Sequence, residues 1–228
     1  MLFKTRGIVF KFVKFKETSI IATIFTDKFG LQSYIVNGVR SKRSNNKIAL
    51  YQPLTLLDMV VYHKENANIN RISEIKCAHP FLSIPYEIKK SSIAMFMIEM
   101  LNKTVKEKIE SEDLFEFLNQ SILFLDHLES GYESFHLQFL IKLSKFLGFD
   151  AGSSDEILNA LYYNPSNESH LEKMEALQQL INHDYSYKLP VDNRLRALLL
   201  DDILRFYKLH FDGISDIKSI KVLREVIS

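Results

Sequence analysis

The sequence holds a single cysteine, Cys77, in 228 residues. One cysteine excludes an internal disulfide framework and any zinc site built from several cysteines. No stretch approaches about eighteen consecutive apolar residues, so we expect no membrane-spanning helix. The N-terminus lacks the uninterrupted apolar core and the small-residue cleavage site of a signal peptide. These absences favour a reducing, cytoplasmic setting and no membrane partner.

The usual catalytic motifs are also missing. The chain has seven glycines, and none of them are spaced as in a glycine-rich phosphate loop. There is no HExxH and no GxSxG, and the seven histidines are scattered. The adjacent acids Asp201 and Asp202 point about 100° apart on a helix, so we interpret them as solvent-facing or as partners of Arg194, Arg196 or Arg205. We therefore predict no catalytic residue, no cofactor and no metal.

A net charge of +1 conceals an asymmetry between the two parts of the chain. Residues 1–80 hold 13 Lys and Arg against 5 Asp and Glu, a net of +8. Residues 81–228 hold 16 against 23, a net of −7. Such asymmetry points to a nucleic acid or another anionic partner on the basic part. The alternative is a basic part that docks on the acidic part of the same chain.

The stretch NGVRSKRSNNK, Asn37 to Lys47, carries four cations and no acid. Phosphate is the expected partner, because each neutralised phosphate releases condensed counterions. Arginine can fork onto two phosphate oxygens, while lysine acts as a point charge. A merely solvated loop is the alternative. The candidate contacts are Arg40, Lys42, Arg43 and Lys47, with Lys11, Lys14 and Lys16 of the first strand extending the same surface.

Aromatic side chains would be needed to stack the bases of a single strand. The chain has no tryptophan, but the basic part contains Phe29, Tyr34, Tyr51 and Tyr62. Each of these rings would also suit a hydrophobic core, and the sequence leaves the choice open.

The first 76 residues read as five strands rich in β-branched and aromatic residues, with Gly30 in a tight turn. They predict a small closed or sandwiched β-domain. Within FKFVKFK, a bulge at Phe12 and Val13 would turn both side chains inward and leave the lysines in water. The expected strands are residues 7–15, 19–26, 31–39, 54–63 and 68–76.

From residue 81 the hydrophobic period becomes helical. Ser111 is expected to cap one helix at its N-terminus, and Gly148 to end the next. Lys142 and Lys145, three residues apart, would share one helix face and could meet an acidic partner segment. The fold class is therefore α+β, with a β-barrel domain of residues 1–80 and an all-α helical domain of residues 81–228.

The residues between Thr5 and Leu57 carry a recognisable combination of motifs. These are GIV, ETSIIATIFT, a turn with glycine, GVRSKRS and ALYQPLTLL. Together they resemble the N-terminal domain of RecO, a family of bacterial recombination mediators. The segment RFYKLHFDGISDIKSIKVLREVI is similar to the closing helices of the same family.

The resemblance implies an oligonucleotide-binding (OB) barrel followed by a helical partner-binding domain. It implies a protein that binds single- and double-stranded DNA, anneals complementary strands and hydrolyses no nucleotide. The implied partners are RecR, in some pathways RecF, and the acidic C-terminal tail of single-stranded-DNA-binding protein, with RecA loaded as the outcome. Arg40, Lys42 and Arg43 match the family's basic motif, with Lys47 as a fourth contact. The implied location is cytoplasmic and nucleoid-associated.

One departure concerns zinc. Many members of the family carry four cysteines after an LGF-like helix end, whereas LGFDAGSSDEILNALYYNPSNESHLEK has none. We expect no zinc there, and packing of Ile157, Leu158, Leu161 and Tyr162 in its place. A second function class stays open, namely a non-enzymatic adaptor whose basic loop binds an acidic protein tail in place of DNA.

Overall fold

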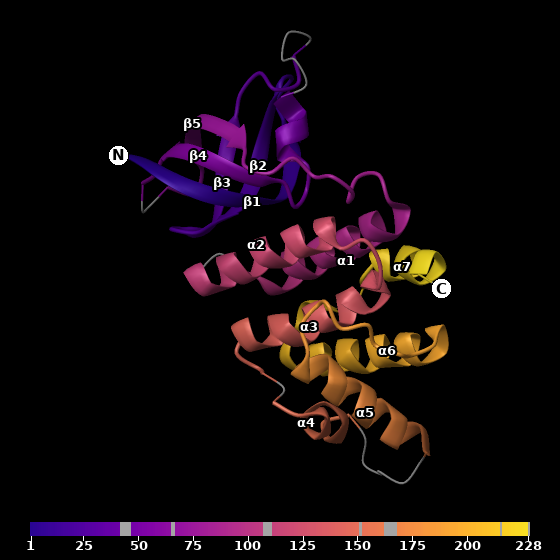
Figure 1. The fold of residues 1–228 in the computed structure, drawn as a ribbon. Helices are drawn as coiled ribbons and strands as arrows, with labels where there is room; N and C mark the ends of the chain where they lie inside the picture. Colours follow the sequence, from indigo (N-terminus) through magenta and orange to yellow (C-terminus); the bar gives the residue numbers. More distant parts are fainter. Residues whose placement is uncertain are drawn as a thin grey trace. The chain divides into compact units, whose positions relative to one another are not determined.

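The computed structural model describes residues 1–41, 47–64, 67–106, 111–150, 152–161, 168–214 and 216–227. It divides into two compact units, one of Met1–Phe81 with Val105–Ile122 and one of Leu82–Thr104 with Leu123–Ser228. Figure 1 shows the strands of the first unit and the helices of the second. The sequence analysis placed a boundary between two domains at residue 80, and that boundary remains a prediction.

The first unit is built on a closed five-stranded barrel. Its strand order is β1-β2-β3-β5-β4, and every pairing is antiparallel except that of β3 with β5. Gly30 has a φ of 59°, which the turn before β3 requires and glycine permits. The predicted α+β class with an N-terminal barrel is confirmed. The strands are β1 (Leu2–Phe15), β2 (Ser19–Thr26), β3 (Gly30–Val36), β4 (Leu56–Tyr62) and β5 (Asn70–Cys77).

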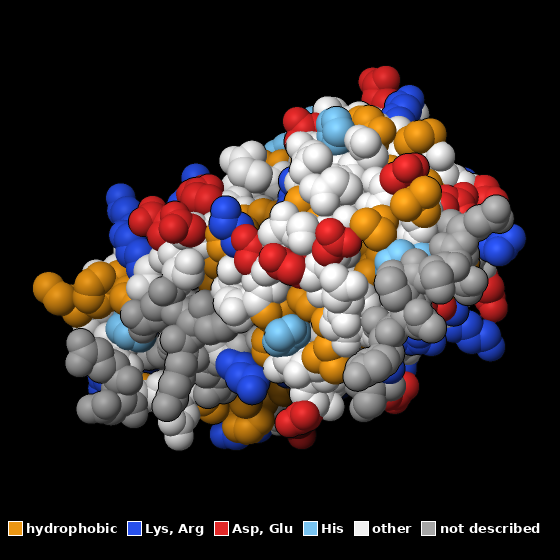
Figure 2. Space-filling view, turned by 90° about the horizontal axis from the view of Figure 1, so that it is seen from below, with side chains coloured by type: hydrophobic (Ala, Val, Ile, Leu, Met, Phe, Trp, Pro, Cys, Tyr) orange, Lys and Arg blue, Asp and Glu red, His pale blue; other side chains and the backbone are white. Residues whose placement is uncertain are grey.

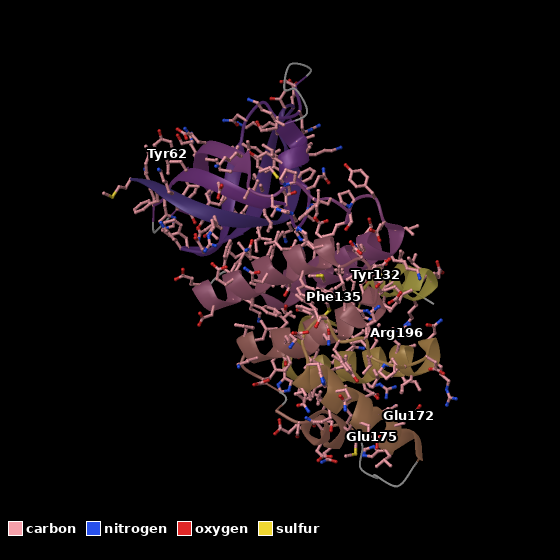
Figure 3. The ribbon with its side chains drawn as sticks, viewed as in Figure 1. Tyr62, Tyr132, Phe135, Glu172, Glu175 and Arg196 are labelled. Carbon is pink, nitrogen blue, oxygen red and sulfur yellow. The ribbon has the colours of Figure 1, made fainter. Side chains whose placement is uncertain are left out.

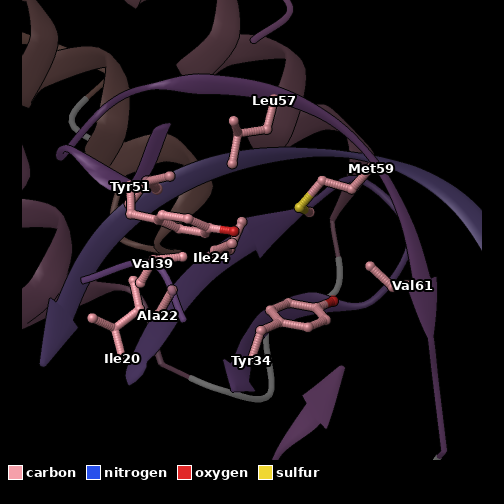
Figure 4. Close-up of a cluster of buried hydrophobic side chains, with 10 residues drawn as sticks. Ile20, Ala22, Ile24, Tyr34, Val39, Tyr51, Leu57, Met59 and Val61 are labelled. Carbon is pink, nitrogen blue, oxygen red and sulfur yellow. The ribbon is translucent and has the colours of Figure 1, made fainter. Parts of the chain in front are cut away.

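Side chains from all the strands except β5 fill the barrel, and partly buried residues of β5 pack against them. Val39 and Tyr51 join this core although they lie in the connection between β3 and β4 (Figure 4). Gly7 faces the same interior, where an added Cβ would lie 2.7 Å from Cγ2 of Ile24. This crowding explains why glycine begins the GIV motif. The buried cluster is Val9, Ile20, Ala22, Ile24, Tyr34, Val39, Tyr51, Leu57, Met59 and Val61.

The bulge in β1 lies earlier than we expected. The register with β2 shifts between Val9 and Lys11, at Phe10, and not at Phe12 and Val13. Phe10 is buried against Phe25, with 5.8 Å between the ring centroids. Val13 is 54% exposed, so the prediction that it turns inward is wrong.

The cause of the difference is a second buried face outside the barrel. Helix α2 (Glu112–His127) places Phe115 against the outward-facing Phe25, with 6.3 Å between centroids. Phe10 can therefore be buried on the outer side, which the sequence pattern alone did not reveal.

The second unit is helical. Ile93, Phe96, Met97, Met100 and Leu101, which share the expected face of α1, are all fully buried. Among the described residues, no helix is both long and apolar enough to cross a membrane. The helices are α1 (Ile88–Thr104), α3 (Phe135–Phe146), α4 (Ser154–Asn159), α5 (Glu168–Asn182), α6 (Asn193–His210) and α7 (Ser219–Ile227).

Both predicted helix ends are confirmed. The Ser111 hydroxyl accepts a 3.1 Å hydrogen bond from the Leu114 N–H at the start of α2. Gly148, after α3, has a φ of 85°, and the Phe149 N–H donates back to the Ser144 carbonyl, as in a Schellman motif.

The region after Gly148, where the sequence lacks the four cysteines that the resemblance would suggest, contains α4. Ile157 and Leu158 of α4 are buried, as expected. Leu161 is half-buried, and Tyr162 lies outside the described residues.

Asp201 and Asp202 have different environments in α6. Asp202 is buried and forms a 2.8 Å ion pair with Lys173 of α5, which is largely buried. Arg205 is more distant from Asp202, at 4.0 Å. Asp201 is half-exposed and pairs with Arg224 of α7 at 2.5 Å. Arg205 was one of the expected partners, so that part of the prediction is confirmed for Asp202. The sequence analysis missed the closer partner Lys173, and it missed Arg224 as the partner of Asp201.

Candidate nucleic-acid interface

The basic stretch between β3 and β4 is anchored at both ends. Arg40 follows Val39, which is buried in the barrel core. Lys47 begins a short 3-10 helix, Lys47–Tyr51, whose last residue is buried in the same core. Lys42 and Arg43 lie outside the described residues. The candidate cations are therefore carried on a segment whose two ends are fixed by core packing.

Hydrogen bonds join the start of this segment to the turn between β1 and β2. The Arg40 N–H donates to the Thr18 carbonyl at 3.0 Å, and the Arg40 guanidinium donates to the Lys16 carbonyl at 3.3 Å. The Ser19 hydroxyl donates to Oδ1 of Asn37 at 3.0 Å. Two candidate contacts that are 24 positions apart in the sequence, Lys16 and Arg40, are thus neighbours. We call this region, with Lys14, Lys16 and Arg40, the basic end of the barrel.

The candidate lysines Lys11, Lys14 and Lys16 do not form a single row. All three are exposed, as expected. Lys11 pairs with Thr23 on the outer face of β2, whereas Lys14 pairs with the core residue Ile20. Residues directly opposite each other in antiparallel strands share a face, so Lys11 and Lys14 lie on opposite faces of β1. Lys16 lies beyond the strand with a φ of 51°, and its ammonium is 5.5 Å from the Phe15 ring.

Three acids of this unit form ion pairs away from the basic end, whereas exposed Glu17 lies next to Lys16 in the turn between β1 and β2. Asp27 and Glu116 both pair with Arg6, at 3.1 and 2.5 Å. Asp58 pairs with Lys76 at 3.2 Å. Within the described ranges, no ion pair joins a cation of the basic end to a carboxylate. Figure 2 shows one face of the molecule, on which acidic and basic side chains are interspersed.

Of the four candidate stacking rings, one is available. Tyr34 and Tyr51 are buried, and burial raises the pKa of Tyr51 to about 12. Phe29 packs against the core and stacks on His63 at 4.0 Å. Tyr62 is 49% exposed and projects from the outside of the barrel (Figure 3).

Strand pairing places a cation beside this ring. Arg71 of β5 is the direct partner of Tyr62 in β4, and both are exposed. A hollow of about 560 Å³ is lined by Tyr62, Lys64, Asn70 and Arg71. The sequence analysis missed Arg71 and Lys64 because they are isolated cations. Alternation in NRISEIK does place Arg71 and Ile72 on opposite faces, but it could not identify the partner strand.

The helical unit has a pocket of about 200 Å³ between α3, α6 and α7. Arg196, labelled in Figure 3, and Arg224 contribute its cations, and Leu223 and Ile227 are among its apolar residues. Burial lowers the pKa of His136, which also lines the pocket, to about 3, and this side chain is therefore neutral.

Lys142 and Lys145 do not line this pocket. The Lys142 ammonium lies 5.9 Å from the Tyr185 ring. Burial lowers the pKa of Lys142, and nearby Asp184 opposes that shift. Lys145 is exposed to solvent.

Comparison with known proteins gives a consistent family match. The model described as "Recombination protein O N terminal" matches residues 1–81, and "Recombination protein O C terminal" matches residues 85–157. The chain is 36% identical over 240 residues to DNA repair protein RecO of Bacteroides fragilis, covering 99% of both chains. It is 34% identical over 243 residues to DNA repair protein RecO of Flavobacterium psychrophilum, covering 100% of both.

Proposed function

This chain belongs to the RecO family of DNA repair and recombination proteins, and on that premise we propose that it binds DNA without sequence preference and anneals complementary single strands. In the same proposal it acts with RecR to load RecA on strands coated by single-stranded-DNA-binding protein, and RecF takes part in some pathways. Such a protein would work in the cytoplasm at the nucleoid. The proposal assigns no catalytic residue.

The observation that carries the DNA proposal is the joining of Arg40 to Lys16 across the end of the barrel. These contacts hold cations from two distant segments on one surface, and Lys14 lies at the same end. Cations without a carboxylate partner are suited to phosphate, because binding then breaks no existing ion pair. Lys42, Arg43 and Lys47 would extend this surface along the anchored segment.

Annealing follows from the same charges. One basic surface that screens two strands lowers their mutual repulsion. Backbone contacts carry no sequence information, so the strands can slide until their bases match. The protein therefore needs neither a nucleotide nor a base-specific contact to speed the pairing.

The wild-type protein should speed the annealing of two complementary oligonucleotides, and its affinity for one strand should fall steeply with salt. Fluorescence anisotropy across a salt series and an energy-transfer annealing assay measure the two effects. If the protein binds acidic peptides but has no affinity for DNA at low salt, the proposal fails and the adaptor function replaces it.

For the acidic tail of single-stranded-DNA-binding protein, we propose the pocket of α3, α6 and α7. Arg224 and Arg196 would meet carboxylates, and the apolar wall of Leu223 and Ile227 would take an apolar side chain. Lys142 and Lys145 stay as a second proposed contact for the tail. Lys145 is better placed than Lys142, because it is exposed.

A pair of matched substitutions tests the pocket. Arg224→Ala should weaken binding of an acidic peptide with an apolar end about 10-fold, because it removes a charge-assisted contact. Asp201→Ala breaks the same 2.5 Å ion pair but leaves the cation, so peptide affinity should stay equal or rise. Calorimetry with each variant measures this. If both variants lose the same peptide affinity, the ion pair and not the Arg224 cation supports binding. If Arg224→Ala binds the peptide like the wild type, the pocket is not the binding site of the tail.

A further inference from the structure

A continuous row of side chains crosses the outer face of the barrel next to its basic end. The row follows the strand pairing step by step, from Val13 to Ile21, to Ile35, to Arg71 and to Tyr62. Paired residues share a face of a sheet, so all five lie on the same side. Adjacent strands are about 4.8 Å apart, which makes the row roughly 20 Å long along the barrel surface.

This row differs from an ordinary barrel exterior. Val13 and Tyr62 are 54% and 49% exposed, Arg71 is exposed, and Ile21 and Ile35 are half-buried. Isolated apolar side chains on a surface need no explanation, but a contiguous row does. Elsewhere on the same barrel exterior, Asp58 and Lys76 form an ion pair, and Phe115 of α2 packs against Phe25.

The chemistry of the row fits the bases of a single strand. Tyr62 offers a ring face for stacking, and the aliphatic side chains offer apolar contact to further bases. Arg71 lies between Tyr62 and Ile35, where it can meet a phosphate or stack on a base. Lys64 lines the hollow next to Tyr62, and Lys11 lies on the outer face of β1, so cations flank the row.

Charge favours nucleic acid over an apolar protein partner. No described carboxylate forms an ion pair with Arg71, Lys64 or Lys11. The row also begins at Val13, next to Lys14 of the basic end. A strand leaving the phosphate contacts of that end could therefore continue directly along the row. In OB barrels generally, the face of strands 2 and 3 is used for oligonucleotides, and Ile21 and Ile35 belong to β2 and β3.

We propose that this row, Val13, Ile21, Ile35, Arg71 and Tyr62, is a base-contacting surface that makes the barrel prefer single-stranded DNA to duplex. The inference rests on the proposed function, because it requires DNA at the basic end. The basic end contacts phosphates, which both forms of DNA present. The row contacts base faces, which a duplex hides. Selectivity for single strands thus resides in Tyr62 and its neighbours, and not in the cationic segment.

The test compares Tyr62→Ala with Tyr62→Phe on three oligonucleotides of equal length. These are a single strand, a blunt duplex and a strand whose central residues are abasic. Tyr62→Ala should weaken binding of the single strand about 10-fold, the loss of one stacked base, and leave the other two unchanged. Tyr62→Phe keeps the ring face and should bind like the wild type. Arg71→Ala should weaken the single strand more than the duplex.

Tyr86→Ala is the matched control, because Tyr86 is an exposed tyrosine of the helical unit, 81% accessible. It should leave all three affinities unchanged. The proposal is overturned if Tyr62→Ala weakens single strand, duplex and abasic strand equally, or if it changes none of them. It is also overturned if Tyr62→Ala loses binding to a partner protein while its affinity for DNA is unchanged. In each of these cases the cations of the basic end can still bind DNA. The proposed function is therefore tested separately, by the DNA affinity and annealing activity of the wild-type protein.

Discussion

Alanine at Arg40, Lys42, Arg43 and Lys47 together should lower the affinity for a single-stranded oligonucleotide by a factor on the order of 100 to 1000 at about 50 mM salt. Each phosphate contact on a single strand contributes about 0.7 to the salt slope, so four lost contacts should reduce it by about 3. The fold should be retained, because the anchors Val39 and Tyr51 are untouched. Anisotropy titrations across a salt series measure both quantities.

The control for this variant removes the same charge elsewhere. Arg194, Lys208, Lys218 and Lys221 are exposed cations of the helical unit, and their combined replacement by alanine also changes the net charge by −4. That variant should lose little affinity and keep the slope. If the two quadruple variants behave alike, DNA responds only to overall charge, and the segment between β3 and β4 is not the site.

Asp202→Asn should lower the free energy of unfolding by about 3 kcal/mol, because it removes the carboxylate charge that lies 2.8 Å from the ammonium of buried Lys173. The neighbouring Asp201→Asn, in the same helix, removes a half-exposed ion pair with Arg224 and should cost about 1 kcal/mol or less. Urea denaturation of the two variants provides the comparison.

A double variant separates the cost of an unpaired charge from the value of the pair. Lys173→Met with Asp202→Leu removes both buried charges and should regain most of the stability that Asp202→Asn loses. Equal destabilisation by Asp201→Asn and Asp202→Asn would contradict the assignment of different environments to the two acids. A double variant less stable than Asp202→Asn would show that the pair itself stabilises α5 against α6.

The sequence predicts the local elements of this fold well, because they depend on local signals. The expected strand at residues 19–26 coincides with β2, and Ser111 and Gly148 mark helix ends as expected. The bulge in β1 was misplaced because its position depends on Phe115, about a hundred residues away, which buries the outer face near Phe10 and Phe25. Periodicity in one strand cannot report a second buried face.

The residues of the candidate interface also divide into those that the sequence reveals and those that only the fold brings together. A run of cations is visible in the sequence, so Arg40 and Lys47 could be proposed as DNA contacts before the fold was known. Arg71 could not, because its closeness to Tyr62 arises from pairing between β4 and β5. For Asp202 the sequence named Arg205 as a possible partner but missed the closer Lys173, because helix packing brings Lys173 in and leaves no pattern in the sequence.

Photo-cross-linking of a single-stranded oligonucleotide containing 5-iodouracil, followed by mass spectrometry of the tryptic peptides, tests the central claim most directly. It uses the unaltered protein and reports which side chains lie against bases. We predict cross-links on peptides of the barrel, with Tyr62 the principal site, and their loss at high salt. Cross-links confined to the helical residues 123–227 would contradict the assignment of DNA binding to the barrel.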